Sequence, residues 1–165
     1  MENQENGQTP SQGETTPDVA MHARNGAAGY TVLRIVLGIN IAAHGFSRLL
    51  TGPGKFAGQL SKQFGTTLLP TAFITAFGYG LPWIEGTLGV MILLGILTWP
   101  ALVAGALLIA VLTFGSCLIQ DWNAAGVQLL YAVVYALLLA SCRYNTISVD
   151  ALLVRRRPNQ PIPRA

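Results

Sequence analysis

The sequence predicts an all-α integral membrane protein, a bundle of four transmembrane helices with a short interfacial helix after the first. Its 165 residues are 52% hydrophobic and only 10% charged, whereas soluble domains carry roughly a quarter charged residues. Mean hydropathy is +0.48. The apolar residues lie in four continuous runs of about 20 residues, the length that a helix needs to cross a bilayer. Because the runs do not alternate between apolar and polar residues, a β-barrel is disfavoured.

The chain divides into three regions by composition. We expect residues 1–28 to form a disordered cytoplasmic tail, residues 29–154 to form the membrane domain, and residues 155–165 to form a basic C-terminal tail. The first region is polar and rich in Gly, Pro, Thr and Gln, a composition typical of disorder. It lacks the basic segment and the apolar segment that make up a signal peptide.

Each apolar run predicts one spanning helix. The expected spans are residues 30–50, 73–98, 100–120 and 124–142. The second run is long enough to be tilted, or broken at "GYGLP". Between the first two runs, Phe56, Leu60 and Phe64 recur at a spacing of four. This spacing favours a short helix lying on the membrane surface, with a polar loop as the alternative.

The segment "NTISVDALLVRRRP" after the last run predicts another short helix. Ser148 is the expected N-cap, Asp150 suits the first turn, and Pro158 ends the helix. The basic cluster of Arg155, Arg156 and Arg157 is expected near anionic lipid headgroups, with an acidic partner as the alternative.

The charges also predict an orientation. An even number of spans places both termini on one side, and that side carries most of the arginines. The positive-inside rule therefore places both termini in the cytoplasm. The positive net charge comes from clusters beside the apolar runs, so a nucleic-acid partner is not implied. The two cysteines show no metal-ligand spacing, and no metal site is expected.

A stretch of the first span, "NIAAHGFSRL", carries Asn40, His44 and Arg48 one helical turn apart and therefore on one face. Counting 1.5 Å per residue along each span predicts that polar side chains from all four helices meet at one depth. The predicted layer contains His44, Glu85, Thr113 and Gln128, with Asn40 and Tyr131 below it and Arg48 above it.

Two interpretations of this layer stay open at this point. Ionisable residues inside a membrane often mark a functional site, here for the polar head of a quinone or for a small anion. The candidate ligand-binding residues are His44, Arg48, Glu85, Gln128 and Tyr131. Alternatively, these residues are hydrogen-bonded glue that holds the bundle together. A buried Glu85 needs His44 or Arg48 as its partner, or it must stay protonated.

Arg34 lies close to the inner boundary and is interpreted as structural. Its side chain can reach the headgroups, or it can pair with Asp150 or with the end of the fourth helix.

Three stretches resemble the DoxX-type membrane protein family. They are "LRIVLGINIAAHGFSRL", "LPWIEGTLGVMILLGILTWPA" and "SVDALL". The resemblance implies a four-helix bundle in a prokaryotic cytoplasmic membrane. That family includes subunits of thiosulfate:quinone oxidoreductase and accessory proteins of other redox systems. On this resemblance His44, Arg48 and Glu85 are carried over as site candidates.

Two functions of different classes follow. The first is an accessory or anchoring subunit of a larger membrane-bound redox or electron-transfer complex, with other membrane subunits and the lipid bilayer as partners. The second is a quinone-interacting subunit of an oxidoreductase of the thiosulfate:quinone type, in which His44 and Glu85 hydrogen-bond a bound quinone. A transporter is less well supported, because the sequence shows no internal repeat.

Overall fold

A computed structural model of the chain describes residues 17–155, and these residues form an all-helical fold without strands. The elements are α1 (Pro17–Thr51), α2 (Pro53–Gln63), α3 (Thr71–Leu94), α4 (Thr98–Leu118), α5 (Trp122–Ala140), the 3-10 turn η1 (Cys142–Tyr144) and α6 (Val149–Arg155). Four of them, α1, α3, α4 and α5, are long and apolar enough to cross a membrane. The predicted fold class is therefore confirmed.

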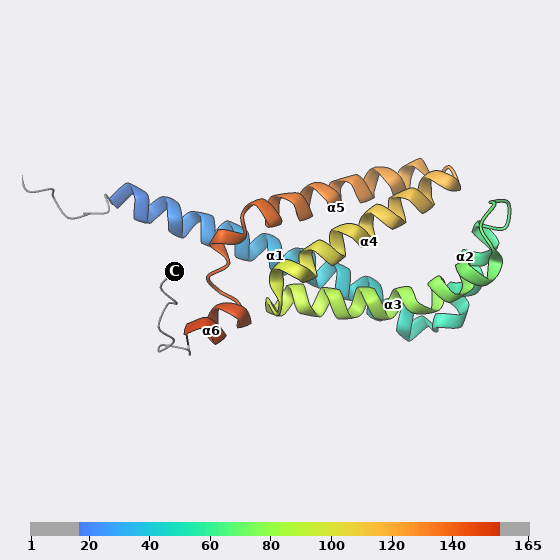
Figure 1. The fold of residues 1–165 in the computed structure, drawn as a ribbon, viewed down its shortest axis with the longest axis horizontal. Helices are drawn as coiled ribbons and strands as arrows, with labels where there is room; N and C mark the ends of the chain where they lie inside the picture. The colour runs from blue at the N-terminus through green and yellow to red at the C-terminus, as the bar shows by residue number, and fades with distance from the viewer. Residues whose placement is uncertain (1–16, 156–165) are drawn as a thin grey trace, which may run out of the picture.

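The spanning helices form two pairs, α1 with α3 and α4 with α5. Figure 1 shows that α3 and α4 meet where they are joined and diverge toward the end of the bundle that carries α2. We call this end the α2 end and the opposite one, where α6 lies, the α6 end.

Small residues allow α1 and α3 to lie in close contact. A Cβ atom at Gly38 would lie 2.6 Å from the backbone nitrogen of Leu93, and one at Gly45 would lie 2.7 Å from the Cα of Gly86. Ordinary contact begins at 3.4 Å, so neither position has room for a side chain. In lipid, the hydrophobic effect does not drive helices together, because the lipid tails are as apolar as the side chains. Close backbone packing of this kind stabilises the helix pair instead.

Helices α4 and α5 are joined by a different contact, a large side chain against a glycine. The ring of Tyr135 lies over Gly105, where a Cβ would be 2.6 Å from the ring. Tyr135 is only 1% exposed, and Leu102 and Leu138 beside it are fully buried. This cluster forms the centre of the apolar core.

At the α6 end, Arg34 fastens three segments together. Its guanidinium donates to the carbonyl oxygens of Ile92 (2.6 Å) and Leu93 (2.8 Å) at the end of α3, and to that of Ile147 (2.8 Å) before α6. Helix ends leave their last carbonyls without partners inside the helix, and Arg34 satisfies two of them. The structural interpretation of Arg34 is confirmed, but its side chain is buried and does not reach outward.

Asp150 also stabilises the α6 end, where it binds the start of α4. Its carboxylate accepts hydrogen bonds from the backbone of Leu97 (2.9 Å) and Thr98 (2.7 Å) and from the Thr98 hydroxyl (2.7 Å). Asp150 thus caps the start of α4 from a distant part of the chain. Ser148 caps α6 as predicted, because its hydroxyl accepts from the backbone of Ala151 at 3.1 Å.

Two sequence expectations differ from the structure. Residues 17–28 were expected in a disordered tail, but α1 begins at Pro17. Helix α3 is not broken at "GYGLP", because it continues through Pro82. Gly78, four residues before Pro82, allows α3 to pack closely on α2. A Cβ atom at this position would lie only 2.7 Å from the Cα of Ala57.

Other expectations stay predictions. Helix α2 forms where a short helix was expected, but its position on the membrane surface is not tested, and neither is the cytoplasmic location of the termini. Pro158 and two of the three clustered arginines, Arg156 and Arg157, lie outside the described residues. The placement of the arginine cluster near lipid headgroups therefore also stays a prediction.

Candidate functional site

The centre of the candidate site is an ion pair between Arg48 and Glu85. Arg48 lies in the last turn of α1, and Glu85 lies in the middle of α3, directly before the glycine contact between Gly45 and Gly86. Glu85 is buried, with its side chain 6% exposed, while the Arg48 side chain is 28% exposed. Of the partners that the sequence allowed for Glu85, the structure selects Arg48.

An aromatic ring from α2 covers the guanidinium of Arg48. The Cζ atom of Arg48 lies 4.6 Å from the centre of the Phe56 ring, within the range of a cation–π interaction. A planar guanidinium can stack on an aromatic ring and bind a carboxylate at the same time, whereas the compact ammonium group of a lysine cannot. Helix α2 therefore helps to hold the ion pair in place.

A cavity of about 360 Å³ lies beside this ion pair. Its lining comes from four helices and includes every residue that the sequence analysis proposed for ligand binding. The polar residues that line it are His44, Arg48, Glu85, Asn123, Gln128 and Tyr131, and the apolar ones are Ile41, Ile109, Leu112, Ala124 and Val127. We call this space the polar cavity. A bundle interior with a few polar groups on apolar walls is a usual place for a small-molecule site.

Two hydrogen bonds tie α5 to its neighbours around the polar cavity. The Gln128 amide donates to the hydroxyl of Ser116 on α4 at 3.0 Å, and the Tyr131 hydroxyl donates to the side-chain oxygen of Asn40 on α1 at 2.8 Å. The side-chain oxygen of Gln128 is buried without a hydrogen-bond partner. Buried polar atoms usually have a partner, so this amide has capacity for one more hydrogen bond.

The predicted position of one residue in the polar layer, Thr113, is wrong. Thr113 does not line the polar cavity, and its hydroxyl donates to the carbonyl of Ile109 one turn earlier in its own helix, at 2.8 Å. The α4 side chain that bonds to Gln128 is instead Ser116, three residues later, although it does not line the polar cavity itself. Threonine often satisfies its hydroxyl on its own helix in this way, and depth counting takes no account of it.

Asn123 is the cavity residue that the sequence analysis missed. It lies in the first turn of α5, whose N-cap Asp121 accepts from the backbone of Ala124 at 3.0 Å. The predicted span began at residue 124 and so excluded it. The N-cap pattern Asp-x-x was the available signal, because it places the helix start before Asn123.

A second, smaller cavity of about 220 Å³ adjoins the polar cavity under α2. The two share Arg48, Leu112, Ala124 and Gln128 in their linings. Its other walls are mostly apolar and include four phenylalanines: Phe56, Phe64, Phe73 and Phe77. We call it the aromatic cavity. Together the two spaces offer a polar end and an apolar end, with Arg48 and Gln128 at their boundary.

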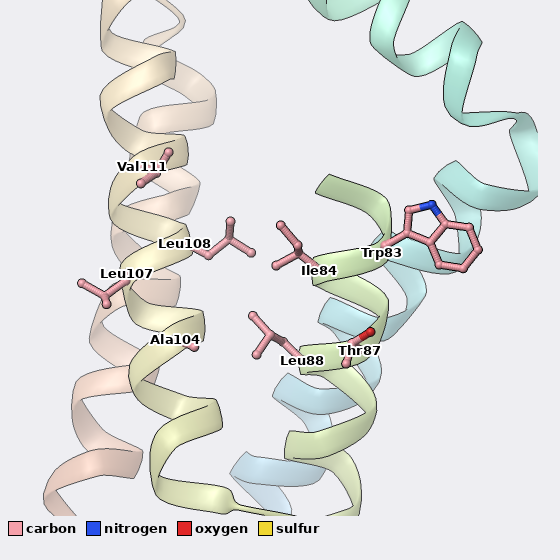
Figure 2. Close-up of a pocket in the computed structure, with 8 residues that line it drawn as sticks. All are labelled: Trp83, Ile84, Thr87, Leu88, Ala104, Leu107, Leu108 and Val111. Atoms are coloured by element: carbon pink, nitrogen blue, oxygen red, sulfur yellow. The ribbon is translucent and has the colours of Figure 1, made fainter. Parts of the chain in front are cut away.

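A third space, between α3 and α4, has a different character. Figure 2 shows Ile84, Leu88 and Leu108 pointing into the gap between the two helices, whereas Trp83 points away from it. The groove has a volume of about 510 Å³, and Thr87 is its only non-aromatic polar residue. It shares no lining residue with the polar cavity. Its composition suits apolar chains and not a polar ligand.

Metal ligands do not gather anywhere in the described part of the chain. Residues 17–155 contain no group of three or more His, Cys, Asp or Glu side chains that could hold a metal ion. The polar cavity instead offers hydrogen-bond donors and acceptors, one cation and one anion.

The comparisons with known proteins correct the family assignment. The family model of methylamine utilisation protein MauE matches residues 27–129, more than half of the chain, and no curated protein or solved structure gives a significant match. The resemblance to the DoxX-type family is therefore wrong. The glycines of its quoted stretches, such as Gly45 and Gly89, serve the close packing of α1 on α3. Close packing of this kind is common to many membrane helix pairs, so the stretches are not specific to one family.

The MauE match spans α1 from Ala27 to the first half of α5. It includes four of the five candidate ligand-binding residues, and Tyr131 lies two positions beyond its end. The chain belongs to the MauE family of methylamine utilisation proteins, and its four apolar helices make it a membrane protein.

Proposed function

We propose that this protein is an accessory subunit of a membrane-bound electron-transfer system. The observation that carries the proposal is the uncovered outer helix of a small bundle. Only 17% of the apolar window of α5 is buried, compared with 39% for α3. The exposed large apolar side chains of α5 are Trp122, Val127, Leu129, Leu130, Val133 and Leu137. Such a face can take lipid or a helix of another subunit.

The family name supports the electron-transfer part of this proposal. It refers to the utilisation of methylamine, a reduced amine whose carbon has to be oxidised before a cell can use it. Oxidation releases electrons that need an acceptor, and membrane-bound carriers are common acceptors. The small described mass outside the predicted spans, which is the start of α1, α2 and the α6 end, fits a subunit that acts together with larger partners.

Extraction from the native membrane tests this proposal. The protein is solubilised in mild detergent from cells grown on methylamine, its complex is sized, and the co-purifying proteins are identified by mass spectrometry. We expect co-migration with redox subunits, and we expect a Val133→Trp variant on the α5 face to weaken it. A stable protein that migrates alone in both cases would contradict the proposal.

A second candidate function is the binding of a quinone head group in the polar cavity. The specific observation in its favour is that His44, Arg48, Glu85, Gln128 and Tyr131 line one space of about 360 Å³. The adjoining aromatic cavity can hold the ring edge or the start of an apolar tail. Stacking against phenylalanine rings would stabilise a flat ligand there.

Substitution of His44 tests the second candidate. Methylamine-dependent reduction of an added short-tail quinone is measured in native membrane vesicles. A His44→Leu variant should lose most of this activity, because the polar cavity loses a hydrogen-bonding group. Phe46→Leu is the matched control, since Phe46 is exposed two residues away and does not line the polar cavity. Equal rates in His44→Leu and in the wild type would exclude this candidate.

A further inference from the structure

The charges around the polar cavity determine which head groups it can accept. We propose that the polar cavity binds the uncharged head of an amphiphile and excludes anions, and that Glu85 is the residue that sets this specificity. The inference rests on the second candidate function, a ligand site in the polar cavity, and it decides between the quinone and the small anion that the sequence left open.

The first argument is the charge balance of the lining. Arg48 is the only Lys or Arg side chain in the polar cavity, and it is already paired with Glu85. An anion drawn to Arg48 would meet the Glu85 carboxylate at a similar distance, so attraction and repulsion nearly cancel. The aromatic cavity adds a second carboxylate, Asp121, and no further Lys or Arg side chain. Among Lys and Arg side chains, the two linings therefore offer no positive charge beyond that of Arg48.

The second argument is the burial of Glu85. Its side chain is 6% exposed, and a buried carboxylate without its counter-ion is strongly unfavourable. A competing anion could take Arg48 only by leaving Glu85 unpaired. An uncharged ligand avoids this loss, because the ion pair can stay intact while the ligand binds beside it.

The third argument is the hydrogen-bonding capacity that the ion pair leaves free. An arginine side chain carries five N–H donors, and one terminal nitrogen of Arg48 contacts Glu85. The Gln128 amide has an unpartnered buried oxygen, and His44 and Asn123 also line the polar cavity. A neutral head with carbonyl or hydroxyl groups can use these partners, and an apolar ring can enter the aromatic cavity.

A pair of probes that share one quinone ring system and differ by a single anionic group tests the inference. The protein is placed in nanodiscs of phosphatidylcholine, and the binding of 1,4-naphthoquinone and of its 2-sulfonate is measured by calorimetry, with empty nanodiscs subtracted. The measurement is made at pH 8, where imidazole side chains are ordinarily neutral. We expect the wild type to bind naphthoquinone at least about tenfold more tightly than the sulfonate.

Substitution of the counter-ion should change this preference. In Glu85→Gln the guanidinium of Arg48 is released, and the affinity for the sulfonate should rise about tenfold while that for naphthoquinone changes little. Asp150→Asn is the matched control, because it removes one negative charge at the α6 end, away from the polar cavity. If Glu85→Gln does not fold, the double variant Arg48→Gln/Glu85→Gln removes both charges and should keep the preference for naphthoquinone.

The possible outcomes distinguish a failure of the charge specificity from the absence of a ligand site. A wild type that binds the sulfonate as tightly as naphthoquinone overturns the inference and leaves a ligand site in place. An unchanged preference in Glu85→Gln, or equal binding of both probes by the double variant, also overturns it. A wild type that binds neither probe removes the ligand site itself.

Discussion

The contact between α1 and α3 offers a sharp test of the packing that holds the ion pair together. We consider the substitution Gly89→Ala on α3. A Cβ atom at this position would lie 2.5 Å from the Cα of Ala42 on α1, whereas ordinary contact begins at 3.4 Å. The backbone nitrogen of Ala42 would lie even closer to this Cβ atom, so the two backbones would have to separate by more than about 0.9 Å at this point. Because Gly38 and Gly45 make equally close contacts along the same pair, the helix pair cannot absorb this shift by a simple tilt.

The magnitude follows from two opposing effects. Replacing glycine by alanine in a helix favours the folded state by about 1 kcal/mol. Forcing an extra methyl group into a well-packed contact costs about 1–3 kcal/mol. The matched control is Gly80→Ala on the same helix, where a Cβ meets nothing within 4 Å. Gly89→Ala should therefore be less stable than Gly80→Ala by about 1–3 kcal/mol.

The assay is unfolding by increasing sodium dodecyl sulfate in mixed micelles, followed by far-ultraviolet circular dichroism. The free energy of unfolding is compared between the two variants and the wild type. We expect Gly80→Ala to be as stable as the wild type or slightly more stable, and Gly89→Ala to unfold earlier. Equal free energies of unfolding for the two variants would refute the close-packing account.

Three further predictions concern the α6 end and the orientation of the chain. Arg34→Leu should lower the free energy of unfolding by about 3 kcal/mol, because buried carbonyl oxygens lose a charged donor; the same titration checks it, and an unchanged midpoint would contradict it. Burial raises the pKa of Asp150, but the hydrogen bonds that it accepts outweigh burial and place this pKa below its ordinary 3.8. Its stabilising effect is therefore complete above about pH 4 and is lost as the pH falls through the lowered pKa, so acid should weaken the wild type more than Asp150→Asn in circular dichroism. In intact cells an impermeant maleimide should label the exposed Cys117, and should label Cys142 only after lysis; the reverse pattern would invert the predicted orientation.

Much of the fold could be predicted because hydrophobic length alone defines a membrane span. The predicted ends of the last three spans lie within a few residues of those of α3, α4 and α5. The start of α1 could not be predicted in this way, since residues 17–28 are polar and leave no hydropathy signal. The continuity of α3 through Pro82 was also hidden, because a proline is tolerated in a membrane helix when its neighbours compensate for it.

The proximity of the candidate site residues could be predicted in part from helix geometry. Helical spacing of four brought His44 and Arg48 to one face, and depth counting brought Glu85 and Gln128 to the same level. Neither argument could choose the partner of Glu85, because that choice depends on the rotation of α3 against α1. The close glycine contacts set this rotation, and they direct Glu85 toward Arg48.

The family assignment from sequence failed for a related reason. Short glycine-containing stretches around Gly45 and Gly89 reflect a packing solution that unrelated membrane proteins share. A family model that matches residues 27–129 as a whole carries more information than three short stretches. The corrected family leaves the bundle unchanged, and the thiosulfate context that the DoxX-type resemblance implied no longer applies.

Occupancy of the polar cavity is the measurement that tests the account most directly. Native membranes are treated with a photoactivatable short-tail quinone analogue, and the labelled peptides are mapped by mass spectrometry, with an unlabelled neutral quinone as competitor. The account predicts competable labels on α1 around His44 and on α5 between Asn123 and Tyr131. Labels confined to lipid-facing residues such as Leu130, or labels that the competitor does not displace, would contradict it.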